Sequence, residues 1–123
     1  MADEGTLATT AQVLLAIGAN PSTAQALEAN TNYWIKFAES EMSTTINNDL
    51  VTNYSSITAG YRQYLATVAA ARAAFHAIQQ DQDNWSLSTT QSKLNVIDAI
   101  WKGWLSFAAD DNKKALLGIS NEA

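Results

Sequence analysis

The stretch LVTNYSSITAGYRQYLATVAAARAAFHAIQQ (residues 50–80) decides the fold that this sequence predicts. Its apolar residues recur in alternating steps of four and three, the spacing of a helix face that packs along another helix. The residues of this seam are Leu50, Tyr54, Ile57, Tyr61, Tyr64, Val68, Ala71, Phe75 and Ile78. The alanine run over residues 69–74 leaves room for a neighbouring helix to approach closely. We therefore predict one long helix over residues 50–80.

A second helical pattern ends at Asn47-Asn48-Asp49, because these residue types favour turns and helix caps. It starts at Asn20-Pro21, which matches a cap followed by proline in the first helical position. Its apolar stripe consists of Leu27, Trp34, Ile35, Ala38, Met42 and Ile46. Residues 21–80 are therefore expected to form an antiparallel helical hairpin.

The rest of the chain adds shorter elements to this hairpin. An N-terminal arm and short helix are expected in residues 1–20, with Gly18 as the stop of a helix over residues 6–17. The apolar side predicted for this helix consists of Leu7, Ala11, Leu14 and Leu15. A polar loop (81–88), a helix (89–109) and a short tail (110–123) follow. The expected fold is a single all-α domain over residues 1–123, an antiparallel bundle of about four helices.

The helix expected at residues 89–109 carries two apolar stripes. The first consists of Leu94, Ile97, Trp101, Trp104 and Ala108, and the second of Val96, Ile100, Gly103 and Phe107. A helix that is apolar on much of its circumference is buried on more than one side. The second stripe must therefore meet either the first helix or another chain.

Aromatic and aliphatic side chains on that second stripe and in the tail are the candidate interface residues. We predict Val96, Ile100 and Phe107 of the helix, together with Leu116, Leu117 and Ile119 of the tail. The alternative is that Val96 and Phe107 cover the first helix.

Composition limits the function classes. The 123 residues include 7 Lys and Arg against 12 Asp and Glu, a formal charge of -5. This balance argues against a generic binder of the phosphate backbone, so no specific nucleic-acid binding is expected. No cysteine is present, which excludes disulfides and cysteine-based metal sites. The acidic start has no pattern of a signal peptide, and no apolar window is long enough for a membrane span.

Residues that could carry catalysis or bind a metal are few. His76 is the only histidine, and no Gly-x-Ser-x-Gly motif accompanies it. Glu39 and Glu41 stand two apart, so they point to different sides of a helix. Asp81-Gln82-Asp83-Asn84 resembles the opening of a calcium loop, but Trp85 occupies the next ligand position. We predict a non-enzymatic protein without catalytic, cofactor-binding or metal-binding residues.

The order of features along the chain resembles that of small all-helical structural proteins of tailed bacteriophages. The matching features are the acidic start at residues 2–9, Gly18-Ala19-Asn20, Phe37-Ala38-Glu39-Ser40-Glu41 before Asp49-Leu50-Val51, the alanine-rich residues 69–78 and the tail Leu116-Leu117-Gly118-Ile119. The pattern is similar to that of head–tail connector proteins, also called adaptor or head-completion proteins. The resemblance implies a homo-oligomeric ring that contacts other virion proteins such as the portal. It also implies a location in the virion, after synthesis in the host cytoplasm.

Two alternatives stay open. Within the same class, the protein is a capsid decoration or tail-associated subunit. From a different class, it is a host-cell helical hairpin that binds a partner, such as an export substrate or a small chaperone. Trp101-Lys102-Gly103 matches the Trp-x-Gly tripeptide of small helical-hairpin substrates of bacterial type VII export. In that group the tripeptide lies between two helices, whereas here it falls within one predicted helix.

Overall fold

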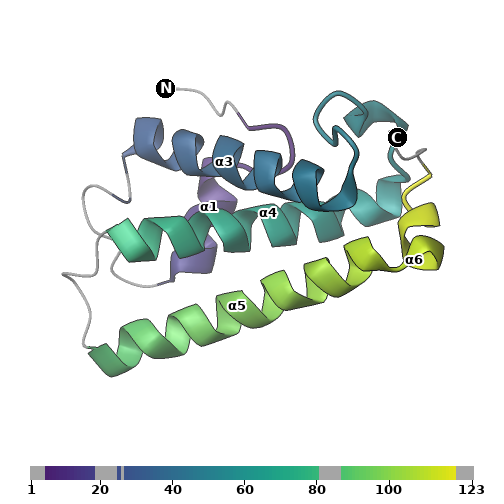
Figure 1. The fold of residues 1–123 in the computed structure, drawn as a ribbon. Coiled ribbons are helices and arrows are strands. Elements are labelled where there is room, and N and C mark those ends of the chain that lie inside the picture. Colours follow the sequence, from purple (N-terminus) through teal and green to yellow (C-terminus); the bar gives the residue numbers. More distant parts are fainter. Residues whose placement is uncertain (1–4, 19–24, 26, 81–86, 119–123) are drawn as a thin grey trace.

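The computed structural model describes residues 5–18, 25, 27–80 and 87–118, and the regular elements among them are helices. Figure 1 labels these helices. They are α1 (Thr10–Ile17), α3 (Glu28–Ile46), the 3-10 helix η1 (Tyr54–Ser56), α4 (Ala59–Gln80), α5 (Leu87–Ala109) and α6 (Asp111–Ala115). The predicted all-α class is confirmed.

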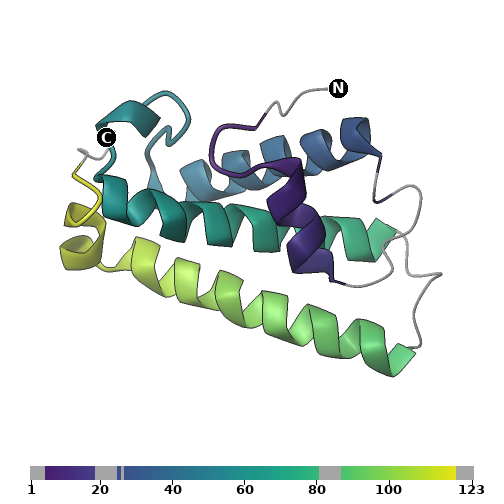
Figure 2. The ribbon, with the colours of Figure 1, turned by 180° about the vertical axis from the view of Figure 1, so that it is seen from behind.

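Three long helices run side by side with alternating direction, and α4 lies between α3 and α5 (Figure 1). The antiparallel neighbours α3 and α4 are the helices of the predicted hairpin. The short helix α1 crosses α4 on one face of this layer, as Figure 2 shows from behind. Among the described residues, the three long helices therefore form a layer with α1 laid across it.

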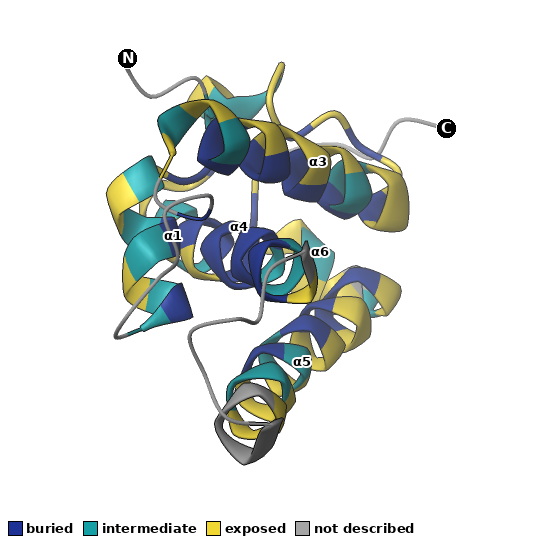
Figure 3. Ribbon diagram, turned by 90° about the vertical axis from the view of Figure 1, so that its left-hand side faces the viewer, coloured by how far each residue is buried: buried dark blue, intermediate teal, exposed yellow. Residues whose placement is uncertain are grey.

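Helix α4 is the centre of the molecule, because its small side chains let α1, α3 and α5 all pack against it. Figure 3 shows its middle turns mostly buried. The buried residues of α4 are Leu65, Ala66, Val68, Ala69, Ala70, Ala71, Ala73, Ala74, Ala77 and Ile78. The expectation that the alanine run admits a close neighbour is confirmed, with three neighbours instead of one.

The long helix predicted from residue 50 is shorter than expected and begins at Ala59. The carboxylate of Asp49 accepts hydrogen bonds from the backbone N–H and the hydroxyl of Thr52, at 3.1 and 2.8 Å. Such local bonds offer the backbone an alternative to a helix. Leu50 and Ile57 are buried nonetheless. The apolar spacing thus identified core positions correctly, but a turn and a 3-10 helix present them.

Helix α3 begins at Glu28, after the predicted start at Pro21, which lies outside the described residues. Leu27 has extended backbone and an exposed side chain, so its assignment to the buried stripe was wrong. The buried side chain of Gln25 donates a hydrogen bond from Nε2 to the carbonyl of Ala77, at 3.0 Å. This bond ties the segment before α3 to the end of α4. The rest of the predicted stripe is buried: Trp34, Ile35, Ala38, Met42 and Ile46.

Helix α1 begins later than predicted because Thr9 caps it. The Thr9 hydroxyl accepts a hydrogen bond from the backbone N–H of Gln12, whose side chain accepts one from the backbone N–H of Thr9. The buried side chains of α1 are Val13 and Ile17. The predicted apolar side was wrong for Ala11 and for Leu15, which is 82% exposed. It was right for Leu7, which is buried, and for Leu14, which is half-buried against the core.

Helix α5 begins at Leu87, inside the segment predicted as the loop 81–88. Leu87 stands seven residues before Leu94, so the helical spacing of the first stripe already includes it. That stripe faces the core as predicted. Ile97, Trp101, Trp104 and Ala108 are buried, and Leu94 is half-buried. Residues 81–86, with the calcium-like tetrapeptide, lie outside the described part of the chain.

The first part of the predicted tail folds back onto the bundle. Asp110 caps α6 by accepting hydrogen bonds from the backbone N–H groups of Asn112 and Lys113. After α6, the carbonyl of Leu117 accepts a hydrogen bond from the backbone N–H of Thr58, at 2.8 Å. The tail up to residue 118 is thus part of the fold.

Candidate functional site

The second stripe of α5 is the predicted interface, and its first half lies at the surface. Val96 is 65% exposed, and Ile100 is half-buried at the edge of the core. Because α1 packs mainly on α4, Val96 does not cover α1, and this alternative was wrong for Val96. The exposed end of the stripe therefore remains a candidate surface for another chain.

Two of the predicted interface residues belong to the protein's own core. Phe107 is 8% exposed, and its ring lies 5.6 Å from that of Trp104 and 5.2 Å from that of Tyr64. It follows Trp104 by three residues, which places both rings on the same side of α5. Leu117 is fully buried, because the backbone bond to Thr58 draws the tail inward. The interface assignment is corrected for both residues.

Of the two other residues predicted in the tail, one lies at the surface and one lies outside the described part of the chain. Leu116 is 47% exposed, as a contact residue requires. Ile119 lies outside the described residues.

An uncharged groove lies beside the exposed end of the α5 stripe, where α1, α4 and α5 meet. Its cavity measures about 320 Å³. The lining residues are Gln12, Leu15 and Ala16 of α1, Gln63, Ala66, Thr67, Ala70 and Ala71 of α4, and Ile100 of α5. We call it the α1/α5 groove. Alanines form most of its α4 wall, so an incoming side chain can approach the backbone of α4 closely.

The C-terminal end of α1 is tied to α5 beside the α1/α5 groove. The Lys93 ammonium of α5 donates a hydrogen bond to the carbonyl of Ile17, at 2.6 Å, which ties the end of α1 to α5. Gly18 then ends α1 with a φ of 91°. Because Val13 and Ile17 face inward, Leu15 projects from the opposite side of the helix, at the rim of the groove.

A second exposed apolar feature lies on α3. Tyr33 is 64% and Phe37 45% exposed, and they stand one helical turn apart with their ring centroids separated by 6.4 Å. We call this pair the aromatic ridge. The Phe37 ring also stacks on the His76 ring, at 4.6 Å and an interplanar angle of 26°. The ridge is thereby held against α4 at one end and projects at the other.

A polar cluster beneath the aromatic ridge joins α3 to α4. The Glu41 carboxylate accepts hydrogen bonds from Nε and Nη2 of Arg72, at 3.1 and 2.8 Å for its Oε2. Its Oε1 lies 2.6 Å from Nε2 of His76. The Arg72 guanidinium also lies over the rings of Phe75 and Trp101, at 4.7 and 4.4 Å. All five groups hold one another in fixed positions.

The electrostatic balance favours an ionised Glu41. Burial raises the pKa of the Glu41 carboxyl, but the hydrogen bonds and charges of Arg72 and His76 outweigh burial and hold this pKa below its usual value. The carboxylate is therefore charged at neutral pH and paired with Arg72. We interpret the cluster as a clamp that sets the register of α3 on α4 and supports Phe37.

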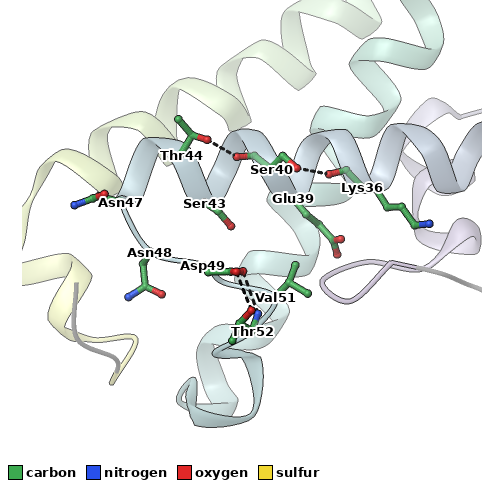
Figure 4. A pocket seen from close by; sticks show the side chains of 10 residues that line it. All are labelled: Lys36, Glu39, Ser40, Ser43, Thr44, Asn47, Asn48, Asp49, Val51 and Thr52. Carbon is green, nitrogen blue, oxygen red and sulfur yellow. Dashed lines mark hydrogen bonds between the residues drawn. The ribbon is translucent and has the colours of Figure 1, made fainter. Parts of the chain in front are cut away.

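A larger polar cavity of about 560 Å³ lies at the C-terminal end of α3 (Figure 4). Glu39, Ser43 and Asp49 are among the side chains that line it. Figure 4 shows Asp49 engaged with Thr52 in the turn after α3. Hydrogen bonds from the backbone and side chain of Thr52 hold the pKa of Asp49 below its usual value. This carboxylate therefore shapes the turn.

Glu39 fastens the N-terminal arm. Its Oε2 accepts hydrogen bonds from the backbone N–H groups of Thr6 and Leu7, at 2.6 and 2.5 Å. Burial nevertheless raises the pKa of Glu39 above its usual value, against the lowering effect of these two bonds. Gly5 lies so close to Ile35 that a Cβ on it would clash with that side chain. The arm is therefore packed tightly across α3.

The two glutamates of α3 point to different sides, as their spacing predicted. Glu39 binds the arm, whereas Glu41 binds α4. Among the described residues, no group of three or more His, Cys, Asp or Glu side chains is arranged to hold a metal ion. Both glutamates thus have roles within the fold.

No protein-family model, curated protein or solved structure matches this chain. Within the described residues, none of the helices is both long enough and apolar enough to span a bilayer.

Sequence reasoning missed the clamp and the aromatic ridge, although their spacing is visible in the chain. Phe37 and Glu41 are four residues apart on one helix, and Arg72 and His76 are four apart on the next. Two such pairs on antiparallel helices can meet face to face. Leu15 was missed as a surface residue because it was placed on the predicted apolar side, whereas Val13 and Ile17 are the buried residues of α1.

Proposed function

We propose that this chain is a non-enzymatic structural subunit of a tailed-bacteriophage virion, a head–tail connector or adaptor that assembles with copies of itself into a ring at the portal. The order of sequence features resembles such proteins. The observation that carries the self-assembly part is the exposed apolar surface around the α1/α5 groove, with Val96 65% and Leu15 82% exposed. Contiguous apolar surface bordered by polar residues is typical of protein contacts.

The carboxylates of the described pockets further support a structural role. Glu39 binds the arm, Glu41 binds α4, and Asp49 shapes a turn. Each is already engaged by neighbouring donors of its own chain. A rigid helical bundle is also suited to repeated lateral contacts, because its backbone changes little on association.

The self-assembly proposal is tested by replacing Val96 with glutamate. A charge at this exposed position leaves the core intact but cannot be buried in an apolar contact without a large desolvation cost. We expect the native chain to form a large closed assembly and Val96→Glu to remain a folded monomer. Light scattering over a concentration series gives the mass, and circular dichroism gives the helical content.

The matched control is Asn95→Glu, which adds the same charge at the neighbouring exposed position of α5. This variant should assemble like the native chain. A native chain that stays monomeric at all concentrations contradicts self-assembly. It would favour the decoration, tail-associated or host-partner alternatives, and a pull-down with portal protein would then separate the virion roles from the host role.

A further inference from the structure

The α1/α5 groove and the aromatic ridge are complementary features on different parts of the same chain. We propose that the ridge formed by Tyr33 and Phe37 of one copy inserts into the α1/α5 groove of the next. This head-to-tail contact would be the lateral interface of the assembly. The inference rests on the proposed self-assembly and specifies its interface.

The chemistry of the two surfaces matches. None of the nine residues that line the groove carries a charge. Leu15, Ile100 and the alanines make its apolar walls, and Gln12, Gln63 and Thr67 add uncharged polar groups. The ridge consists of two aromatic rings, the kind of side chain that anchors interfaces by filling apolar pockets. Lys36 lines the same surface hollow as the two rings. Since each copy has a formal charge of -5, this cation does not oppose a contact with a second copy whose groove carries no charge.

The other exposed large apolar side chains of the described residues are aliphatic and lack the flat rings that anchor interfaces. They are Leu15, Leu27, Val51, Val96, Leu105 and Leu116. Tyr33 and Phe37 form a ridge that the stack on His76 and the clamp below it hold in place. Such preorganisation lowers the entropy cost of binding.

The positions of the two surfaces determine the symmetry of the contact. The ridge belongs to α3, and the groove lies between α1 and α5, with α4 between α3 and α5 (Figures 1 and 3). The two surfaces of one copy therefore cannot fill each other. A contact between different patches is heterologous and generates a ring when its rotation closes. This is the symmetry that a connector ring requires.

The area available agrees with an anchored contact. Complete burial of an aromatic side chain removes on the order of 150–250 Å² from water, and a standard interface buries about 800 Å² per partner. Tyr33 and Phe37 are 64% and 45% exposed, so the two rings supply only a part of that area. The ridge would therefore supply the centre of the interface, and the flanks of α1, α3 and α5 the remainder.

Crosslinking tests the proposed contact directly, because the chain has no cysteine of its own. Thr67→Cys places a thiol in the groove, and Ala29→Cys places one on α3, one turn before Tyr33. Both positions are exposed. We expect a mixture of the two single variants to give a crosslinked dimer with a short bis-maleimide. The double variant should give a ladder of products that ends at the ring size, with neither single variant forming a dimer alone.

The control thiol is Thr44→Cys, an exposed position on the same helix as Ala29. The two positions are roughly 22 Å apart at 1.5 Å per residue, so Thr44→Cys should not link to Thr67→Cys. Dimers from Thr67→Cys alone would overturn the inference in favour of a symmetric contact between two grooves. No link between Thr67→Cys and Ala29→Cys, in a preparation that light scattering shows to be assembled, would overturn the ridge contact while self-assembly stands. A monomer in that measurement would overturn both.

A charge substitution gives a second, independent readout. Tyr33→Glu should reduce the assembled mass to that of the monomer, because the charge cannot enter the groove. Ala29→Glu, with the same charge one turn earlier, should weaken assembly far less. An equal loss of assembled mass in both variants, or no loss in either, would contradict a contact centred on the ridge.

Discussion

At the scale of single residues, Glu39 shows how a buried carboxyl can both hold and destabilise a fold. Its Oε2 satisfies two backbone donors, yet burial raises the pKa of Glu39 above its ordinary value. A carboxyl with a higher pKa in the folded chain favours folding while protonated, and this contribution is lost as pH rises through the folded-state pKa. We therefore expect Glu39→Gln to raise the free energy of unfolding at pH 7. The gain should disappear below pH 4.5, the ordinary pKa of the residue.

Denaturant titrations at pH 7 and pH 4 would measure this gain, and Glu39→Ala provides the contrast. The amide oxygen of glutamine can accept the same two bonds, whereas alanine leaves the N–H groups of Thr6 and Leu7 without an acceptor. The alanine variant should lose about 2 kcal/mol or more at both pH values. If Glu39→Gln is as destabilised as Glu39→Ala, the carboxylate charge is essential to the arm, and our prediction is wrong.

At the scale of helices, the two glycines at Gly18 and Gly103 have opposite roles. Gly103 lies within α5, and a Cβ added there would meet no atom within 4 Å. Gly103→Ala should therefore stabilise the monomer by about 1 kcal/mol, the difference in helix propensity.

Gly18 ends α1 with a φ of 91° and a ψ of -158°, a conformation almost restricted to glycine. Gly18→Ala should lower the free energy of unfolding by roughly 1–3 kcal/mol. Thermal melts of both glycine variants would measure these changes. A gain at Gly18 would contradict the geometry of this helix end.

The helices that the sequence predicted well are those whose apolar spacing coincides with real packing. The spacing over residues 59–80 and the first stripe of α5 marked buried faces correctly, because α4 and α5 pack along each other. The prediction failed where local hydrogen bonds override periodicity. Asp49 and Thr52 form a turn inside the predicted seam, and Thr9 moves the start of α1. Apolar spacing indicates which side chains are buried, but cap and turn residues decide whether a helix presents them.

At the scale of the whole molecule, the candidate surface could be predicted only in part. Val96 and Ile100 were identified from amphipathicity and Leu116 from the apolar tail, and all three lie at or near the surface. Phe107 and Leu117 were assigned to the same interface but are buried by contacts with Tyr64 and Thr58, residues distant in sequence. The α1/α5 groove depends on how α1 crosses α4, and no spacing within either helix encodes that crossing. Surfaces assembled from three helices therefore required the folded structure.

The charge of the whole chain leads to a last prediction about the assembly. Each copy carries a formal charge of -5, so the proposed ring would carry a multiple of this charge and a negative potential that repels DNA phosphates. We expect the purified assembly to retain no duplex DNA even at about 50 mM salt, where electrostatic binding to phosphates is strong. Gel mobility of a short duplex with increasing protein would measure retention, and Val96→Glu would report the behaviour of the unassembled chain. Tight binding that weakens steeply with salt would require a basic surface on the ring. The proposed connector at the portal would have to let DNA pass without adhering, so that result would contradict the proposed role.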